Sequence, residues 1–112
     1  MRIKSSKRSE ELISELTRIF NFHSDSVIAR IAYCYSLQQS KRFELAVAPL
    51  DQKGRDFLSD TNLFGAAQKG STYLPLYKAL LDQHYQKSLS DDEFKVLFSH
   101  HLEFGLEKIN ER

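Results

Sequence analysis

The sequence predicts a mainly α-helical protein that forms a single compact domain over residues 1–112. Its length of 112 residues is that of one domain. Hydrophobic residues make up 41% and charged residues 28%, a balance typical of globular rather than disordered chains. Apolar residues recur at helical spacing along most of the chain. We expect an arm and two helices over residues 1–37, a turn or loop region over 40–62, and a helical half over 63–112.

The N-terminal residues 1–8 carry no helix signal, and we expect a short extended arm or strand there. Ser9 is followed by two glutamates, a pattern typical of a helix N-cap with an acidic first turn. Apolar residues then follow at positions i, i+1, i+4, i+7 and i+8. This spacing predicts a first helix over about residues 9–21.

A second helix is predicted over residues 27–37, with Ser24 or Ser26 as its N-cap. Its residues are apolar around most of the circumference, so the helix requires cover on more than one face. A domain of this size offers little spare cover. We therefore expect part of this helix to lie in an interface between subunits, and Cys34 within it to be buried and inert.

The middle of the chain has a different pattern. Residues 43–48 alternate with a period of two, which is typical of a strand. Pro49 ends that run, and residues 51–54 form a turn signal in which Gly54 can adopt a positive φ. These features predict a short hairpin or an irregular loop.

The C-terminal half predicts a helical turn over residues 63–67 and then two longer helices. Ser71 or Thr72 caps the first of these, which has Pro75 in its first turn. Its inner stripe is expected to hold Tyr73, Tyr77, Leu80, Leu81 and His84.

The last helix opens with a capping box formed by Ser90 and Glu93. Gly105 lies on its apolar stripe, where glycine lowers helix stability by up to ~1 kcal/mol relative to alanine. We therefore expect another backbone to approach closely there. The stripe comprises Phe94, Leu97, Phe98, His101, Leu102, Gly105 and Ile109.

The sequence contains no recognisable catalytic or metal-binding motif. His100 and His101 are adjacent, so on a helix their side chains point about 100° apart. His84 could supply a further ligand, but no Cys-x-x-Cys, His-Glu-x-x-His or paired Asp motif accompanies it. We expect His101 to be a hydrogen-bonded core or interface residue, His100 to be exposed, and the protein to be a non-enzyme without cofactor or metal.

No apolar run approaches the ~20 residues of a transmembrane helix. The basic N-terminus is not followed by the apolar stretch of a secretory signal. We therefore expect a cytoplasmic protein without a membrane partner.

Charge is distributed unevenly along the chain. Residues 1–55 hold 10 Lys/Arg and 6 Asp/Glu, a balance of +4, whereas residues 56–112 hold 6 and 9, a balance of −3. The asymmetry predicts a polyanionic partner for the first half, and a solvated basic tail is the alternative.

Residues 1–37, interpreted as strand, helix and helix, are similar to a ribbon-helix-helix DNA-binding domain. Such domains pair the strands of two protomers antiparallel and insert them into the major groove. In this chain, residues 1–7 would form that strand.

A second resemblance covers nearly the whole chain. The chain resembles the DndE family, the small DNA-binding component of bacterial DNA sulfur modification (phosphorothioation). The matching features are the basic start RIKSSKRSEEL, the turn over 51–57, the step Leu63-Phe64-Gly65, and HHLEFGLEKI at 100–109.

The DndE resemblance implies a mainly helical homotetramer without a cofactor. It also implies binding to duplex DNA, with a preference for nicked DNA, through surface lysines, and cooperation with the other proteins of the phosphorothioation complex. We expect the acidic C-terminal half to face away from DNA or to serve assembly. The candidates for phosphate contact are Arg2, Lys4, Lys7, Arg8, Lys41, Arg42, Lys53 and Arg55.

Two other function classes remain open at this point. One is a scaffold subunit that bridges the sulfur-transfer partners and touches DNA weakly or not at all. The other is a ribbon-helix-helix repressor that binds a palindromic operator. An enzyme is the least favoured class.

Overall fold

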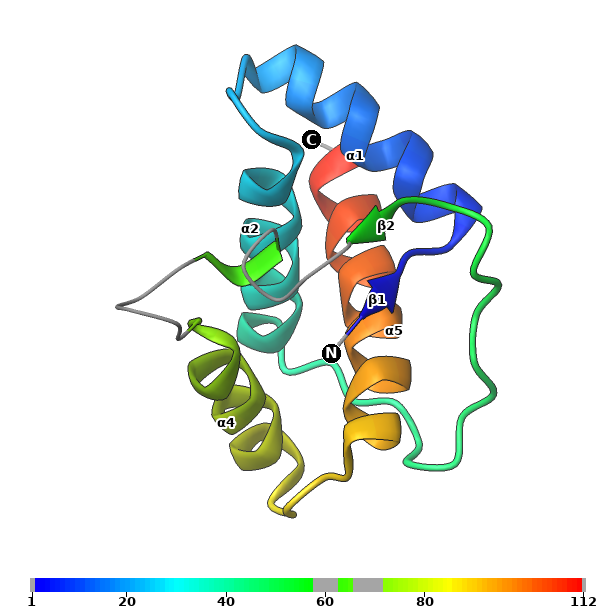
Figure 1. Ribbon diagram of the computed structural model, residues 1–112, viewed down its shortest axis with the longest axis vertical. Helices are drawn as coiled ribbons and strands as arrows, with labels where there is room; N and C mark the ends of the chain where they lie inside the picture. The colour runs from blue at the N-terminus through cyan, green and yellow to red at the C-terminus, as the bar shows by residue number, and fades with distance from the viewer. Residues whose placement is uncertain (1, 58–62, 66–71, 112) are drawn as a thin grey trace.

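The computed structural model describes residues 2–57, 63–65 and 72–111, and it is mainly helical as predicted (Figure 1). A two-stranded antiparallel sheet accompanies the helices. The elements in chain order are β1 (Ile3–Lys4), α1 (Lys7–Phe20), α2 (Asp25–Gln38), β2 (Asp56–Phe57), α4 (Leu74–Tyr85) and α5 (Asp91–Asn110).

Helix α5 forms the centre of the core, with α2 along one side, α1 across its C-terminal part and α4 near its start (Figure 1). The predicted stripe of α5 is buried from Phe94 to Gly105. A Cβ atom on Gly105 would lie 1.9 Å from the carbonyl oxygen of Ala32 in α2. The expected close approach of another backbone at this glycine is therefore confirmed.

Helix α1 begins earlier than the sequence predicts, at Lys7. Its N-cap is Ser6, whose hydroxyl accepts a hydrogen bond from the backbone N–H of Ser9 at 3.0 Å. The prediction of Ser9 as the cap is wrong because Ser6, an equally good capping residue, takes the extended conformation that a cap requires. Lys7 and Arg8 consequently lie in the first turn of a helix and not in an arm.

Helix α2 follows the prediction, with Ser24 as its cap. One face, including Ala29 and Ala32, is buried against the core, but the opposite face is open and Ile31 is 44% exposed. Cys34 lies on this open face and is exposed, so the prediction that it is buried is wrong. The reason is that, among the described residues, the core packs against the face of α2 that holds Ala29 and Ala32, and Cys34 lies away from that face.

The alternating residues 43–48 do not form a strand. Phe43 and Val47 pack against the core, and a turn between them is closed by a hydrogen bond from the Val47 N–H to the Glu44 carbonyl at 3.0 Å. The region is an irregular loop, one of the two predicted alternatives. The strand pairing involves later residues instead, because β2 pairs with β1 in the register Ile3 to Phe57 and Lys4 to Asp56.

The start of α4 differs in detail from the prediction. Thr72 accepts a hydrogen bond from the backbone N–H of Leu74 at 3.0 Å. Tyr73, however, is the N-cap residue and is 46% exposed, so it does not belong to the inner stripe. Ser71 and part of the predicted turn over 63–67 lie outside the described residues, whereas Leu63 and Phe64 are helical and buried.

The capping box of α5 is present as predicted. The Glu93 N–H donates to the Ser90 hydroxyl at 3.1 Å, and the Ser90 N–H donates to the Glu93 carboxylate at 2.9 Å. Among the described helices, none is long and apolar enough to cross a membrane.

Candidate nucleic-acid interface

Two chain segments that carry many of the predicted basic residues are joined in space. The Ser5 N–H donates to the Arg55 carbonyl at 2.8 Å, and the Gly54 N–H donates to the Ser5 carbonyl at 3.0 Å. A Cβ atom on Gly54 would lie 2.1 Å from the Ser6 carbonyl oxygen, so glycine permits this contact. The result is an edge of the molecule on which Arg2, Lys4, Lys7, Lys53 and Arg55 lie on adjoining backbone.

The two aspartates on this edge have structural partners. Asp51 accepts hydrogen bonds from the backbone N–H groups of Lys7 at 2.9 Å and Lys53 at 3.1 Å, and these bonds lower the pKa of its carboxyl group. Asp56 accepts two hydrogen bonds from the Arg2 guanidinium, at 3.1 and 2.6 Å. These bonds lower the pKa of Asp56 and raise that of Arg2. The carboxylates therefore hold the backbone and Arg2 in place.

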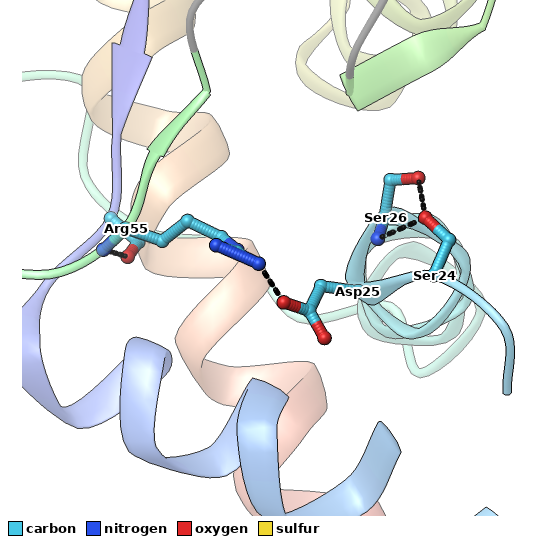
Figure 2. Close-up of polar contacts among 5 residues, drawn as sticks. Ser24, Asp25, Ser26 and Arg55 are labelled. Atoms are coloured by element: carbon cyan, nitrogen blue, oxygen red, sulfur yellow. Dashed lines mark hydrogen bonds and ion pairs between the residues drawn. The ribbon is translucent and has the colours of Figure 1, made fainter. Parts of the chain in front are cut away.

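Arg55 has a different role from the other cations. Its guanidinium forms an ion pair with Asp25 at the first turn of α2, directly beside the Ser24 cap (Figure 2). The pair ties the segment before β2 to the start of α2. Arg55 is thus engaged within the fold.

The lysines of this edge differ from Arg55 in that their ammonium groups are not paired with carboxylates among the described residues. Lys4, Lys7 and Lys53 are exposed, and none forms an ion pair with a carboxylate in the part of the chain that the structure describes. Lys95 of α5, which sequence reasoning placed with the acidic half, lines the same depression as Arg2 and Lys4. We call Arg2, Lys4, Lys7, Lys53 and Lys95 the basic edge.

Of the three remaining predicted candidates, Lys41 and Arg8 lie near acidic side chains. The Lys41 ammonium lies 5.1 Å from the ring centre of Phe43 and 5.3 Å from that of Phe104, in a depression shared with Glu103 and Glu107. The Arg8 guanidinium lies 4.0 Å from the Glu107 carboxylate. Arg42 is exposed. The acidic neighbours make this region less positively charged than the basic edge.

His101 belongs to a buried hydrogen-bonded chain, as predicted. Its Nδ1 lies 2.6 Å from the Ser36 hydroxyl and its Nε2 lies 2.8 Å from the Tyr85 hydroxyl. Tyr85 also accepts a hydrogen bond from the Phe43 N–H at 2.9 Å, which extends the chain to the loop before β2. Burial lowers the pKa of His101 to about 3, so the ring is neutral.

The other candidate reactive groups are dispersed. His100 is partly exposed, and its Nε2 lies 2.8 Å from the Ala48 carbonyl. Partial burial raises the pKa of the Cys34 thiol. Over residues 2–57, 63–65 and 72–111, His, Cys, Asp and Glu form no group of three that could hold a metal ion.

Comparisons with known proteins agree with this fold. No curated protein sequence matches the chain. The crystal structure of DndE from Escherichia coli B7A, involved in DNA phosphorothioation modification, is similar with a TM-score of 0.73 and 17% identity, over 96% of this chain and 95% of that one. The crystal structure of a DndE G21/24K mutant involved in DNA phosphorothioation has a TM-score of 0.75, with the same identity and coverage. The family model of the DNA sulphur modification protein DndE matches residues 2–112, and the chain therefore belongs to the DndE family.

Proposed function

We propose that this protein is a non-enzymatic DNA-binding subunit of the DNA phosphorothioation system. It binds duplex DNA through the basic edge and prefers nicked DNA. The observation that carries this proposal is the group of exposed lysines Lys4, Lys7 and Lys53 on adjoining segments whose aspartates already have partners, with the half-buried Lys95 of α5 in the same depression as Lys4. Membership of the DndE family supports it.

Recognition of this kind depends on the DNA backbone. A lysine ammonium is a flexible point charge that suits contact with phosphates of varied geometry. Phosphate contacts carry no sequence information, so binding is expected to be indifferent to base sequence. A nick makes the duplex easier to deform, and a protein that bends its site gains affinity where the deformation costs less.

We further propose that the protein acts as a homotetramer. A monomer with net charge +1 is a weak polyanion binder, and four copies would combine several basic edges. The open face of α2 offers an assembly surface. Ile31 of this face and Phe20 at the end of α1 are exposed beside an apolar depression of about 220 Å³.

The same apolar face favours a second candidate function, a scaffold subunit. In that case the face would receive another protein of the phosphorothioation complex. The repressor alternative loses support, because β1 pairs with β2 of its own chain, whereas a ribbon-helix-helix domain pairs this strand with a second protomer.

Binding assays separate these possibilities. Fluorescence anisotropy should detect binding to intact and nicked duplexes of one sequence, with tighter binding to the nicked one. Lys7→Gln and Lys53→Gln should each weaken binding to both. Lys78→Gln and Lys87→Gln are matched controls, since these ammonium groups pair with Asp91 at 2.9 Å and Glu93 at 2.7 Å.

The control variants remove the same charge and should leave affinity nearly unchanged. Light scattering should give the mass of four protomers. Absence of DNA binding, together with capture of a sulfur-transfer protein through the Ile31 face, would favour the scaffold instead.

A further inference from the structure

A depression of about 200 Å³ lies where β1, the loop before β2 and helix α5 meet. Three cationic residues line it, Arg2 and Lys4 from the N-terminal segment and Lys95 from α5. No carboxylate is among the described residues that line it. In Figure 1 the N-terminal strand runs beside the middle of α5, which brings these distant parts of the chain together.

The donors of this depression are only partly used. Arg2 donates hydrogen bonds from Nε and one terminal nitrogen to the Asp56 carboxylate. These bonds hold the guanidinium in place and leave its other N–H groups available. Lys4 and Lys95 form no ion pair with any carboxylate among the described residues. Gln52 adds an amide group. The hydroxyl of Ser99 already donates to the Lys95 carbonyl at 3.0 Å, so the lysines are the principal open donors.

Some walls of the depression are apolar. Ile3 is 3% exposed, and Leu50 and Val96 line the same space. Charge attraction is stronger beside such walls than in open water, because the local dielectric constant is lower. A space of this size is smaller than the roughly 300–1,000 Å³ of pockets for drug-sized ligands. It therefore suits one small anionic group with part of an attached sugar.

We propose that this depression binds a phosphate monoester, the terminal phosphate of a DNA strand such as the one exposed at a nick. The inference rests on the proposed DNA-binding function and names the group that this part of the basic edge recognises. A phosphate monoester carries about −1.5 to −2 charge at pH 7, which the two ammonium groups of Lys4 and Lys95 can balance, while the Asp56-paired Arg2 adds N–H donors. A diester carries a single charge and is attached to the chain on both sides. A strand end can therefore place its phosphate deeper in a depression of this size than a continuous strand can.

The test compares three duplexes of one sequence by fluorescence anisotropy. One is intact, one has a nick with a 5′-phosphate, and one has a nick with a 5′-hydroxyl. The wild-type protein should bind the 5′-phosphate nick about tenfold more tightly than the 5′-hydroxyl nick, since one charge-assisted contact contributes about this factor. Lys4→Gln and Lys95→Gln should abolish this difference. Lys87→Gln should keep it.

Lys95→Arg retains the charge and should retain most of the discrimination, which separates loss of the contact from damage to the fold. Inorganic phosphate at millimolar concentration should remove the preference for the phosphorylated nick if the free anion occupies the same depression. Equal affinity for the two nicked duplexes would overturn the inference and leave the proposed function standing. Failure to bind any duplex would overturn the proposed function itself.

Discussion

Replacement of Gly105 by alanine tests the packing of α2 on α5. The new Cβ atom would lie 1.9 Å from the Ala32 carbonyl oxygen, whereas ordinary contact begins near 3.4 Å. The helices would therefore have to separate by about 1.5 Å at this point. Overpacking of this kind lowers stability by roughly 1–3 kcal/mol, and we expect the upper end because the clash is with backbone. Alanine regains up to ~1 kcal/mol of helix propensity.

The expected net loss is about 2 kcal/mol in the free energy of unfolding. Urea denaturation followed by circular dichroism should show a lower midpoint, and Tm should fall by about 8 °C for a domain of this size. Gln83→Ala, on the exposed side of α4, is the control and should change little. Ala32→Gly in the same chain should not rescue Gly105→Ala, because the clashing atoms are backbone. An unchanged or raised midpoint in Gly105→Ala would refute this view of the helix contact.

Three further outcomes are expected. Protonation of His101 is disfavoured in the folded protein, where the pKa of its imidazole is about 3, compared with an ordinary 6.5. The free energy of unfolding should therefore be highest above pH 6.5 and decrease as the pH falls below that value. The loss should reach about 2 kcal/mol at pH 5 and be smaller in His101→Gln, as urea midpoints across pH would show. Ile31→Asp should leave the fold intact but reduce the mass seen by light scattering, and an unchanged mass would exclude this face from assembly. The exposed Cys34 should react with a thiol reagent in the folded protein. The reaction should be slower than that of a cysteine in an unstructured peptide, because the pKa of the Cys34 thiol is raised. Cys34→Ser should not alter DNA binding.

Local signals explain the features that the sequence predicted well. The Ser90 and Glu93 capping box needs only residues three apart, and the structure contains both of its hydrogen bonds. Gly105 could be singled out because glycine on an apolar helical stripe is unfavourable without a packing reason. His101 likewise followed from its place on that stripe, although its partners, Ser36 and Tyr85, could not be identified from spacing.

Long-range pairing explains what the sequence did not predict. Two serines, Ser6 and Ser9, could each cap α1, and tertiary contacts decide between them, since Ser6 also donates to Glu103 at 2.7 Å. Phe43 and Val47 pack against the core from a loop, whereas Leu45 between them is 41% exposed, and the alternation of apolar residues over 43–48 could not distinguish this loop from a strand. The strand that pairs with β1 is too short to give a pattern.

The sequence predicted only part of the candidate interface, because part of it depends on contacts between residues far apart in the chain. The first eight residues and the turn over 51–57 were identified by their charge, and the structure joins them by hydrogen bonds. Charge alone could not separate Arg55, which pairs with Asp25, from the open lysines. Nor could it include Lys95, whose place beside Lys4 depends on the packing of β1 near α5.

The salt dependence of DNA affinity tests the central claim most directly. Each lysine that contacts a phosphate releases about one counterion, so log K should fall linearly with log salt at a slope of about −0.9 per contact. The slope should become less steep by roughly one unit in each of Lys4→Gln, Lys7→Gln, Lys53→Gln and Lys95→Gln, equally on unrelated sequences, and remain unchanged in Lys87→Gln. A slope that is the same in all these variants, or an affinity that ignores salt, would contradict DNA binding through the basic edge.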